Sequence, residues 1–426
     1  MPPSIPHDII LDIIDSLQHD PKSLVQSSLV SRCFRVPCHK HLFYSISIPF
    51  LHPRKGMERL KHFLRLLTYN PEIATYVREL HIVDNDEDTG WATKTNILPR
   101  LLQKLRNLHT FSLVFRHMNH VAWTSLNPTL RSALVHLLQS NVLKALNLGN
   151  LCFDDPSIIA LGLSNRLKKL GIVSCGHAVH ADYPLLMPQT THPNKTHLES
   201  LEIGGSISTR VLESLTHPQS NLTISQLRQL SIQGGSAQTM EAACSIIKTA
   251  FNTIESLRWI FPNVATEQLI SPHKPTIVNP FGPIDVKVLK NLRHLLLGIT
   301  SEKGESPCSG QFAWLARALL DTSLPHSLEE VTIVTVSTLF GVVSRANGAR
   351  IRQIYRSLRN VGLDAIFGDN RRFPKLRKVT ITVDPYDRIE DPNGFEDFLT
   401  TLFPLLSSKE ILHTEFRDVH GIFMGA

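Results

Sequence analysis

The sequence predicts an α/β repeat fold, in which a short all-α module precedes a solenoid that has a curved parallel sheet with helices on its convex side. Three observations lead to this prediction. The first 48 residues carry helix start signals and wide apolar faces. A six-residue pattern, apolar-x-x-apolar-x-apolar, then recurs ten times from residue 77 onward. Amphipathic helical segments lie between several copies of this pattern.

Composition sets the broad class of the protein. With 426 residues, 42% of them hydrophobic, the chain is long enough for one large domain or two to three ordinary ones. No apolar stretch is long enough to span a bilayer, and the first residues lack the basic segment of a secretory signal. Six scattered cysteines suit a reducing compartment. We therefore expect a cytoplasmic or nuclear protein without membrane contact.

The N-terminal module is predicted to contain three short helices. Pro6 suits a helix start, because the N–H that proline lacks would be unpaired in the first turn. Asp20 and Pro21 mark a second start, as cap and first residue. Pro37 is expected to end this second helix, and a third follows at roughly 39–44. The apolar faces of the first two helices comprise Ile9, Ile10, Ile13, Ile14, Leu17, Leu24, Val25, Leu29, Val30, Cys33 and Phe34.

A module of this size cannot bury all of these residues by itself. A unit of about 50 residues hides only about 60% of its surface, and many such units need a partner or a staple. We therefore predict a surface that another protein covers. The predicted organisation is a module over residues 1–48, a linking segment over 49–76 with an amphipathic helix at 57–69, and repeats over 77–420.

We call the recurring six-residue pattern the hexad. Its apolar residues are expected to point inward from a short strand, while the x residues point outward on the concave face. Successive hexads start 24 to 48 residues apart, near or above the leucine-rich-repeat period of about 20–29 residues. Helices are expected between hexads, for example at 155–163, 208–215 and 239–251. The ten hexads begin at Val77, Leu108, Leu143, Leu167, Leu198, Leu227, Ile254, Leu292, Leu328 and Leu376.

These features together resemble a known family. The stretch IPHDIILDIIDSL, followed by DPKSLVQSSLVSRCFRVPCHKHLFYSI, resembles the F-box motif, which opens with Leu-Pro or Ile-Pro and ends in a Leu-Phe or Leu-Trp segment. The hexads are similar to the divergent leucine-rich repeats of fungal F-box proteins. The resemblance to the F-box covers about residues 5–48.

The resemblance implies a non-catalytic role in a Skp-cullin-F-box ubiquitin ligase. The F-box would bind a Skp-family adaptor and, through it, cullin, and the repeats would bind an unknown protein substrate. No cofactor is implied. A non-catalytic interaction scaffold that acts without cullin has the same sequence features and remains an alternative. Seven residues would face the adaptor or the module's own small core, namely Pro6, Ile10, Ile14, Leu24, Leu29, Val30 and Phe43.

A basic segment at 345–378 is a second candidate site. Arg352, Arg356 and Arg359 are expected on one helical face, where their forked guanidinium groups suit phosphate or carboxylate. The alternative is a solvated basic helix. Nucleic-acid binding is not favoured, because aromatic residues that stack on bases are not interleaved with the basic ones.

Three groups of polar residues invite a metal site, but none has a matching spacing. Cys33, Cys38, His39 and His41 match no zinc pattern. The acidic run from Asp84 lacks the glycine and the final glutamate of a calcium loop. The histidines between 177 and 197 have no helix or hairpin spacing, so we expect no metal.

No catalytic motif is evident. The chain lacks a nucleophile elbow, a phosphate-binding loop, a dinucleotide fingerprint and a zinc-protease helix. An enzyme on an α/β layer fold is therefore disfavoured, and the sequence predicts a binding protein.

Overall fold

The computed structural model describes residues 6–50, 53–84, 91, 94–115, 121–153, 164–173, 195–204, 209–217, 220–233, 237–261, 288–300, 327–336, 348–360, 362–383 and 392–416. The chain divides into two compact units. Unit 1 comprises Met1–His197 with His217–Leu222, and unit 2 comprises Leu198–Thr216 with Thr223–Ala426.

Unit 1 begins with three helices and continues with strands that alternate with helices. The helical module comprises α1 (His7–Ser16), α2 (Pro21–Val30) and α3 (Arg32–Leu42). The following elements are β1 (Ser45–Phe50), α4 (Pro53–Tyr69), α5 (Ile73–Tyr76), β2 (Glu79–Asp84), α7 (Ile97–Lys104), β3 (Thr110–Phe115), β4 (Val121–Ala122), the 3-10 helix η1 (Trp123–Ser125), α8 (Pro128–Leu138), β5 (Ala145–Gly149), β6 (Leu151–Cys152), β7 (Lys169–Val173) and β8 (Thr196–His197).

Unit 2 repeats the alternation of strand and helix. Its elements are β9 (Ser200–Gly204), α10 (Thr209–Thr216), β10 (Leu222–Thr223), β11 (Gln229–Gln233), α11 (Ala237–Ala250), β12 (Ser256–Phe261), β13 (His294–Thr300), β14 (Glu330–Val336), α13 (Gly348–Asn360), α14 (Leu363–Phe367), β15 (Lys378–Val383), α15 (Pro392–Leu402), α16 (Pro404–Ser408) and β16 (Leu412–Phe416).

The fold is mixed α/β, with a long and open parallel sheet. Within the described residues the sheet has twelve strands, five from unit 1 (β1-β2-β3-β5-β7) and seven from unit 2 (β9-β11-β12-β13-β14-β15-β16). Among the described residues, the neighbouring strands of this sheet inside each unit are parallel. The prediction of a parallel sheet with intervening helices is therefore confirmed.

The ten hexads mark ten of these strands. Each strand begins at the third residue of its hexad, and the apolar fourth and sixth residues align across neighbouring strands. In unit 1, Leu80 pairs with Phe111 and Ile82 pairs with Leu113. In unit 2, Leu230 pairs with Leu257 and Ile232 with Trp259. Because strand side chains alternate between faces, this register places every apolar pair on one face of the sheet.

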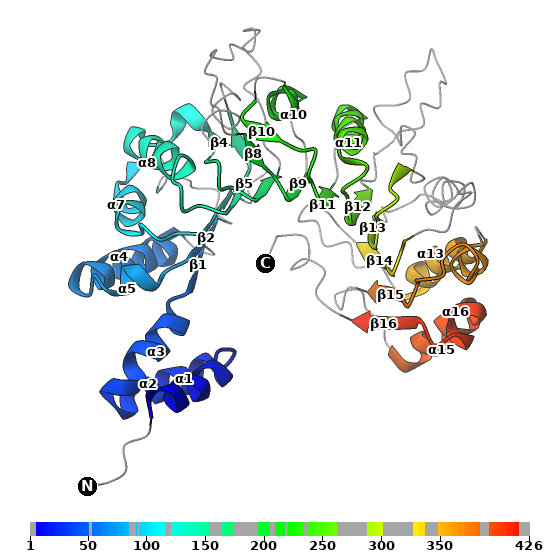
Figure 1. Ribbon diagram of the computed structural model, residues 1–426, viewed down its shortest axis with the longest axis horizontal. Helices are drawn as coiled ribbons and strands as arrows, with labels where there is room; N and C mark the ends of the chain where they lie inside the picture. The colour runs from blue at the N-terminus through cyan, green and yellow to red at the C-terminus, as the bar shows by residue number, and fades with distance from the viewer. Residues whose placement is uncertain are drawn as a thin grey trace. The chain divides into compact units, whose positions relative to one another are not determined.

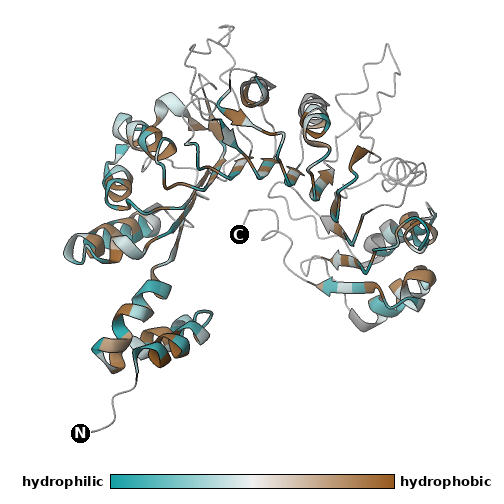
Figure 2. Ribbon diagram, in the orientation of Figure 1, coloured by the Kyte–Doolittle hydropathy of each residue, from teal (hydrophilic) through white to brown (hydrophobic). Residues whose placement is uncertain are grey.

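That face carries the core of each unit. The first residues of nine hexads, such as Val77 and Leu143, are almost fully buried, whereas the first residue of the tenth, Leu376, is half-buried. Helices such as α4, α7 and α8 in unit 1 lie beside one face of the strands, and α11, α13 and α15 do so in unit 2 (Figure 1). Hydrophobic and hydrophilic residues alternate along these strands (Figure 2).

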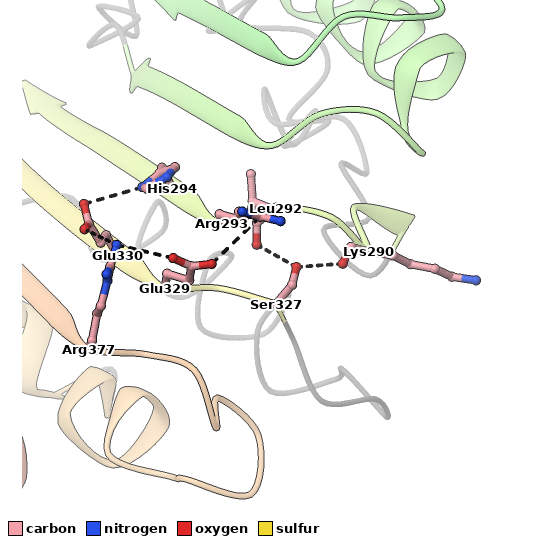
Figure 3. A network of polar contacts seen from close by, with 8 residues as sticks. All are labelled: Lys290, Leu292, Arg293, His294, Ser327, Glu329, Glu330 and Arg377. Carbon is pink, nitrogen blue, oxygen red and sulfur yellow. Dashed lines mark hydrogen bonds and ion pairs between the residues drawn. The ribbon is translucent and has the colours of Figure 1, made fainter.

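Polar side chains just before several hexads tie consecutive turns together. Asn291 Nδ2 donates to the carbonyl oxygen of Asn252 at 2.6 Å. Ser327 Oγ donates to the carbonyl oxygens of Lys290 at 2.6 Å and Leu292 at 2.9 Å (Figure 3). These bonds satisfy backbone carbonyl oxygens near the starts of the strands. Buried carbonyl oxygens need such donors where no helix supplies them.

Neither edge strand was predicted from the sequence. β1 contains Pro49, which an edge strand tolerates because one side of its backbone needs no partner. β16 lacks the hexad, since Lys409 and Thr414 stand where the first and sixth apolar residues would be. The predicted helices at 57–69, 208–215 and 239–251 correspond to α4, α10 and α11, whereas 155–163 lies outside the described residues.

Candidate functional site

The N-terminal module has a very small core. Ile14 and Cys38 are fully buried, and Ile10 and Leu24 are 5% and 1% exposed. Leu17, Phe34 and Leu42 pack around these four residues and are partly buried. So few buried side chains contribute little hydrophobic stabilisation for three helices, at about 1.5–3 kcal/mol for each fully buried one.

Other apolar residues of the module face outward. Leu29 and Val30, at the end of α2, are 81% and 74% exposed. Single exposed apolar residues are common, but several on one small module indicate a contact surface. We call these residues the exposed apolar set: Ile9, Ile13, Val25, Leu29, Val30 and Val36.

Polar contacts hold the three helices in place without covering this set. Asp20 caps α2, because its Oδ1 accepts from the backbone N–H of Lys22 at 3.1 Å and of Ser23 at 3.2 Å. These hydrogen bonds lower the pKa of Asp20, that from the Ser23 hydroxyl most of all. His41 Nε2 lies 2.7 Å from Asp15 Oδ1, which joins α3 to α1. The first contact fixes the start of α2 and the second joins α3 to α1, and neither involves the C-terminal turn of α2.

The predicted course of the second and third helices is wrong. The second helix ends at Val30 rather than at Pro37, because Ser31 is extended, with φ −157° and ψ 164°. The next helix, α3, runs from Arg32 to Leu42 and contains Pro37. A proline removes one backbone hydrogen bond, here the one that the Cys33 carbonyl would accept. Burial of Pro37 beside Cys38 accompanies this loss.

The seven predicted contact residues separate into two groups. Ile10, Ile14 and Leu24 belong to the module's own core. Pro6, Leu29 and Val30 are exposed, and Phe43 is half-buried with its ring 5.5 Å from that of His39. Only the second group is available to a partner. Ile9, Ile13, Val25 and Val36 were not among the predicted contact residues. For Ile9, Ile13 and Val25, the width of the apolar faces was an available signal.

The structure assigns other roles to the cysteines and histidines of the module. Cys38 is buried in the core, and this burial raises the pKa of its thiol. Cys33 is exposed, and His41 contacts Asp15. Burial and the nearby Arg35 lower the pKa of His39. In the described part of the chain, no three His, Cys, Asp or Glu side chains gather in a group that could hold a metal ion.

Asp84, the first residue of the calcium-like run, is fully buried. Its Oδ2 accepts a hydrogen bond of 2.8 Å from Trp91 Nε1. The Trp91 ring stacks on Phe50 at 4.5 Å and lies 6.0 Å from Phe115. The carboxylate thus helps to fix an aromatic stack at the ends of β1 to β3. Residues 85–90 and the histidines at 177, 180 and 192 lie outside the described residues.

The basic candidate site lies on α13. The guanidinium carbons of Arg352 and Arg356 lie 5.8 and 5.7 Å from the centre of the Phe398 ring, which belongs to α15. Arg359 is exposed one turn further on. Among the described residues, none of the three arginines has a carboxylate within ion-pair distance. Two of the three guanidinium groups therefore lie over one aromatic ring, and their N–H groups remain available to bind a phosphate or carboxylate.

Comparison with known proteins finds no family model that matches this chain and no curated protein that matches its sequence. Of the helices within the described residues, each is too short or too polar to cross a lipid bilayer.

Proposed function

We propose that this protein is a substrate-receptor subunit of a Skp-cullin-F-box ubiquitin ligase. In this proposal α1 to α3 are the F-box that binds a Skp-family adaptor and, through it, cullin. The sheet and its helices are a leucine-rich-repeat solenoid that holds a protein target. The complex would act in the cytoplasm or the nucleus.

The observation that carries the proposal is the exposure of Leu29 and Val30 on a module with a four-residue core. A partner that buried one of these side chains completely would gain about 1.5–3 kcal/mol of hydrophobic free energy. Apolar anchors at the centre of an interface supply most of its binding energy. A partner that covers the exposed apolar set would therefore also stabilise the module itself.

Two further features support the part of the proposal that concerns the repeats. Ten strands start at the same place in the hexad, and their apolar residues continue in register along each unit. Each strand and helix pair can bury its apolar face only against its neighbours, as in repeat proteins. The third and fifth residues of each hexad lie on the other face of the strands, where a target would bind.

The proposed mechanism is proximity rather than chemistry. A receptor that holds its target near a charged conjugating enzyme raises the effective concentration of the target's lysines. This role requires no catalytic side chain in the receptor. The alternative is a scaffold that binds the adaptor without cullin, and detection of cullin in the purified complex decides between the two.

The proposal is tested by co-expressing the full chain with a Skp-family adaptor and measuring their co-elution by size exclusion. We expect a stable complex for the wild type and none for Leu29→Asp combined with Val30→Asp, because a charge cannot be buried in an apolar interface without a partner. Tyr69→Asp is the control for an exposed position outside the module, since Tyr69 is 82% exposed on α4.

The control variant should bind the adaptor as the wild type does. Wild-type protein that is folded and monomeric beside free adaptor would contradict the proposal. So would unchanged co-elution of the double variant. Circular dichroism of each variant shows whether it is folded.

A further inference from the structure

The second residues of the hexads form a continuous row at one edge of the sheet in each unit. In unit 1 the backbone N–H of His109 donates to the carbonyl of Arg78 at 2.7 Å, and Lys144 donates to His109 at 2.7 Å. Lys168 donates to Lys144, again at 2.7 Å. Neighbouring strands lie about 4.8 Å apart, so the side chains of this second-position row are equally closely spaced.

In unit 2 the charges along this row alternate. Arg228 Nε lies 3.9 Å from Glu255 Oε1, and Arg293 Nε lies 3.8 Å from Glu329 Oε1. Arg377 bridges Glu329 at 3.3 Å and Glu330 at 3.1 Å, as Figure 3 shows. Each charge has a neighbour of opposite sign, so this part of the row has little attraction left for a charged partner. The full order is Glu199, Arg228, Glu255, Arg293, Glu329 and Arg377.

In unit 1 every residue of the row is basic or a histidine. The order is Arg78, His109, Lys144 and Lys168, and Lys169 follows directly on β7. Lys144 and Lys169 are exposed, and among the described residues neither has an ion-pair partner. Arg78 Nη1 donates to the carbonyl oxygens of Thr75 at 2.8 Å and of Asn107 at 3.4 Å, which fixes its guanidinium group.

The basic residues act on one another. Burial, and then the positive charges of Lys144 and Arg78, lower the pKa of His109, while Glu79 opposes this shift. Glu79 is the acidic residue beside the row, and its Oε2 lies 3.7 Å from His81 Nε2. Like charges at such spacing repel one another, and a negative partner would remove this repulsion.

We propose that the unit 1 part of the second-position row binds an acidic, extended segment of a partner protein. Three basic side chains and His109, on four consecutive strands, extend over about 14 Å, which exceeds a single small anion and suits a short peptide. No aromatic residue interrupts the row, so it lacks the platforms on which the bases of a single strand stack. The inference does not depend on adaptor binding, because it concerns a different surface.

The test is fluorescence anisotropy of the full-length protein with a labelled decaglutamate peptide. Lys144→Glu combined with Lys169→Glu should weaken binding by about tenfold or more, as two charge-assisted contacts become repulsive. The matched control is Lys61→Glu with Arg65→Glu, which makes the same change of net charge at two exposed residues of α4. The control should bind within about twofold of the wild type.

Three outcomes would overturn the inference. The first is no binding of decaglutamate by the wild type, and the second is equal weakening in the two double variants, which would mean attraction by net charge alone. The third is tighter binding of a labelled decathymidylate oligonucleotide than of the peptide, which would assign the row to nucleic acid. Co-elution with the adaptor, measured on the same variants, should be unchanged, so failure here and failure of the proposed function are distinguishable.

Discussion

Leu24 and Leu29 lie five residues apart on α2, yet Leu24 is 1% exposed and Leu29 is 81% exposed. Leu24 packs with Ile10, Ile14 and Cys38, whereas the side chain of Leu29 points into solvent. One helix therefore contributes both to the core of the module and to its candidate contact surface, and substitutions at the two leucines separate these roles.

Leu24→Ala should destabilise the helical module strongly. Removing a buried leucine costs about 2–5 kcal/mol, and the small core offers little to refill the space. Leu29→Ala should change stability by less than about 0.5 kcal/mol. Hydrogen exchange of the α1–α3 amides, followed by mass spectrometry, measures both. Equal loss of protection in the two variants would contradict the assigned burial.

Asp364 should be important for the packing of α14 against α16. Its carboxylate accepts from the backbone N–H groups of Leu405 and Leu406, each at 3.1 Å, and the residue is 9% exposed. Asp364→Ala leaves two donors unpaired, with an expected cost of about 1–3 kcal/mol in urea unfolding. Asp369→Ala is the control, because Asp369 is more exposed and these contacts of its side chain are local, a hydrogen bond from Arg371 N and an ion pair with Arg372. An equal cost at both positions would argue against the cap.

Gly298 should tolerate no side chain. A Cβ atom there would lie 2.7 Å from Ile260 Cγ1 on the neighbouring strand, and Ile260 is fully buried. Gly298→Ala should therefore cost about 1–3 kcal/mol in thermal or urea unfolding. The cost of Gly298→Ala combined with Ile260→Ala should be smaller than the sum of the two single costs, because the shorter side chain at position 260 removes the clash. Strictly additive effects would show that the close approach does not matter.

Glu202 should make stability depend on pH. Burial raises the pKa of this carboxyl, although Arg258 lowers it in part. The folded state therefore holds the proton more tightly than the unfolded state, so stability is lost as the pH rises from the ordinary pKa through the raised one. Glu202→Gln keeps an acceptor for Gln233 Nε2 and should flatten this decline. Urea unfolding of the wild type and of Glu202→Gln from about pH 4 to about pH 8 measures this decline of stability. Identical pH profiles for the two proteins would contradict the prediction.

Arg356 and Phe398 should be energetically coupled. The cation lies 5.7 Å from the ring centre at an exposed position, for which a coupling of about 0.5–1 kcal/mol is usual. A double-mutant cycle of Arg356→Met and Phe398→Leu in urea unfolding gives this coupling energy. A value indistinguishable from zero would mean that the ring does not hold the arginine.

The ten hexads predict ten of the twelve strands that the described residues contribute to the long sheet, and they miss the two edge strands. These ten strands could be predicted, because inward apolar residues at a spacing of two are a local property of the chain. The sequence also determined the start of α2, since Asp20 caps a helix within its own turn. These features depend on contacts between residues that are close in the sequence or that repeat along it.

Which apolar residues stay exposed and which charges find partners depends on how the helices and strands pack. Leu24 and Leu29 belong to the same apolar stripe, and the packing of α1 and α3 covers only the first. Likewise, Arg293 forms an ion pair with Glu329 at the start of the neighbouring strand, while Lys144 has no ion-pair partner among the described residues. Pro37 remains inside α3, and Pro49 inside an edge strand. In each case the result depends on residues distant in the sequence, which local patterns do not specify.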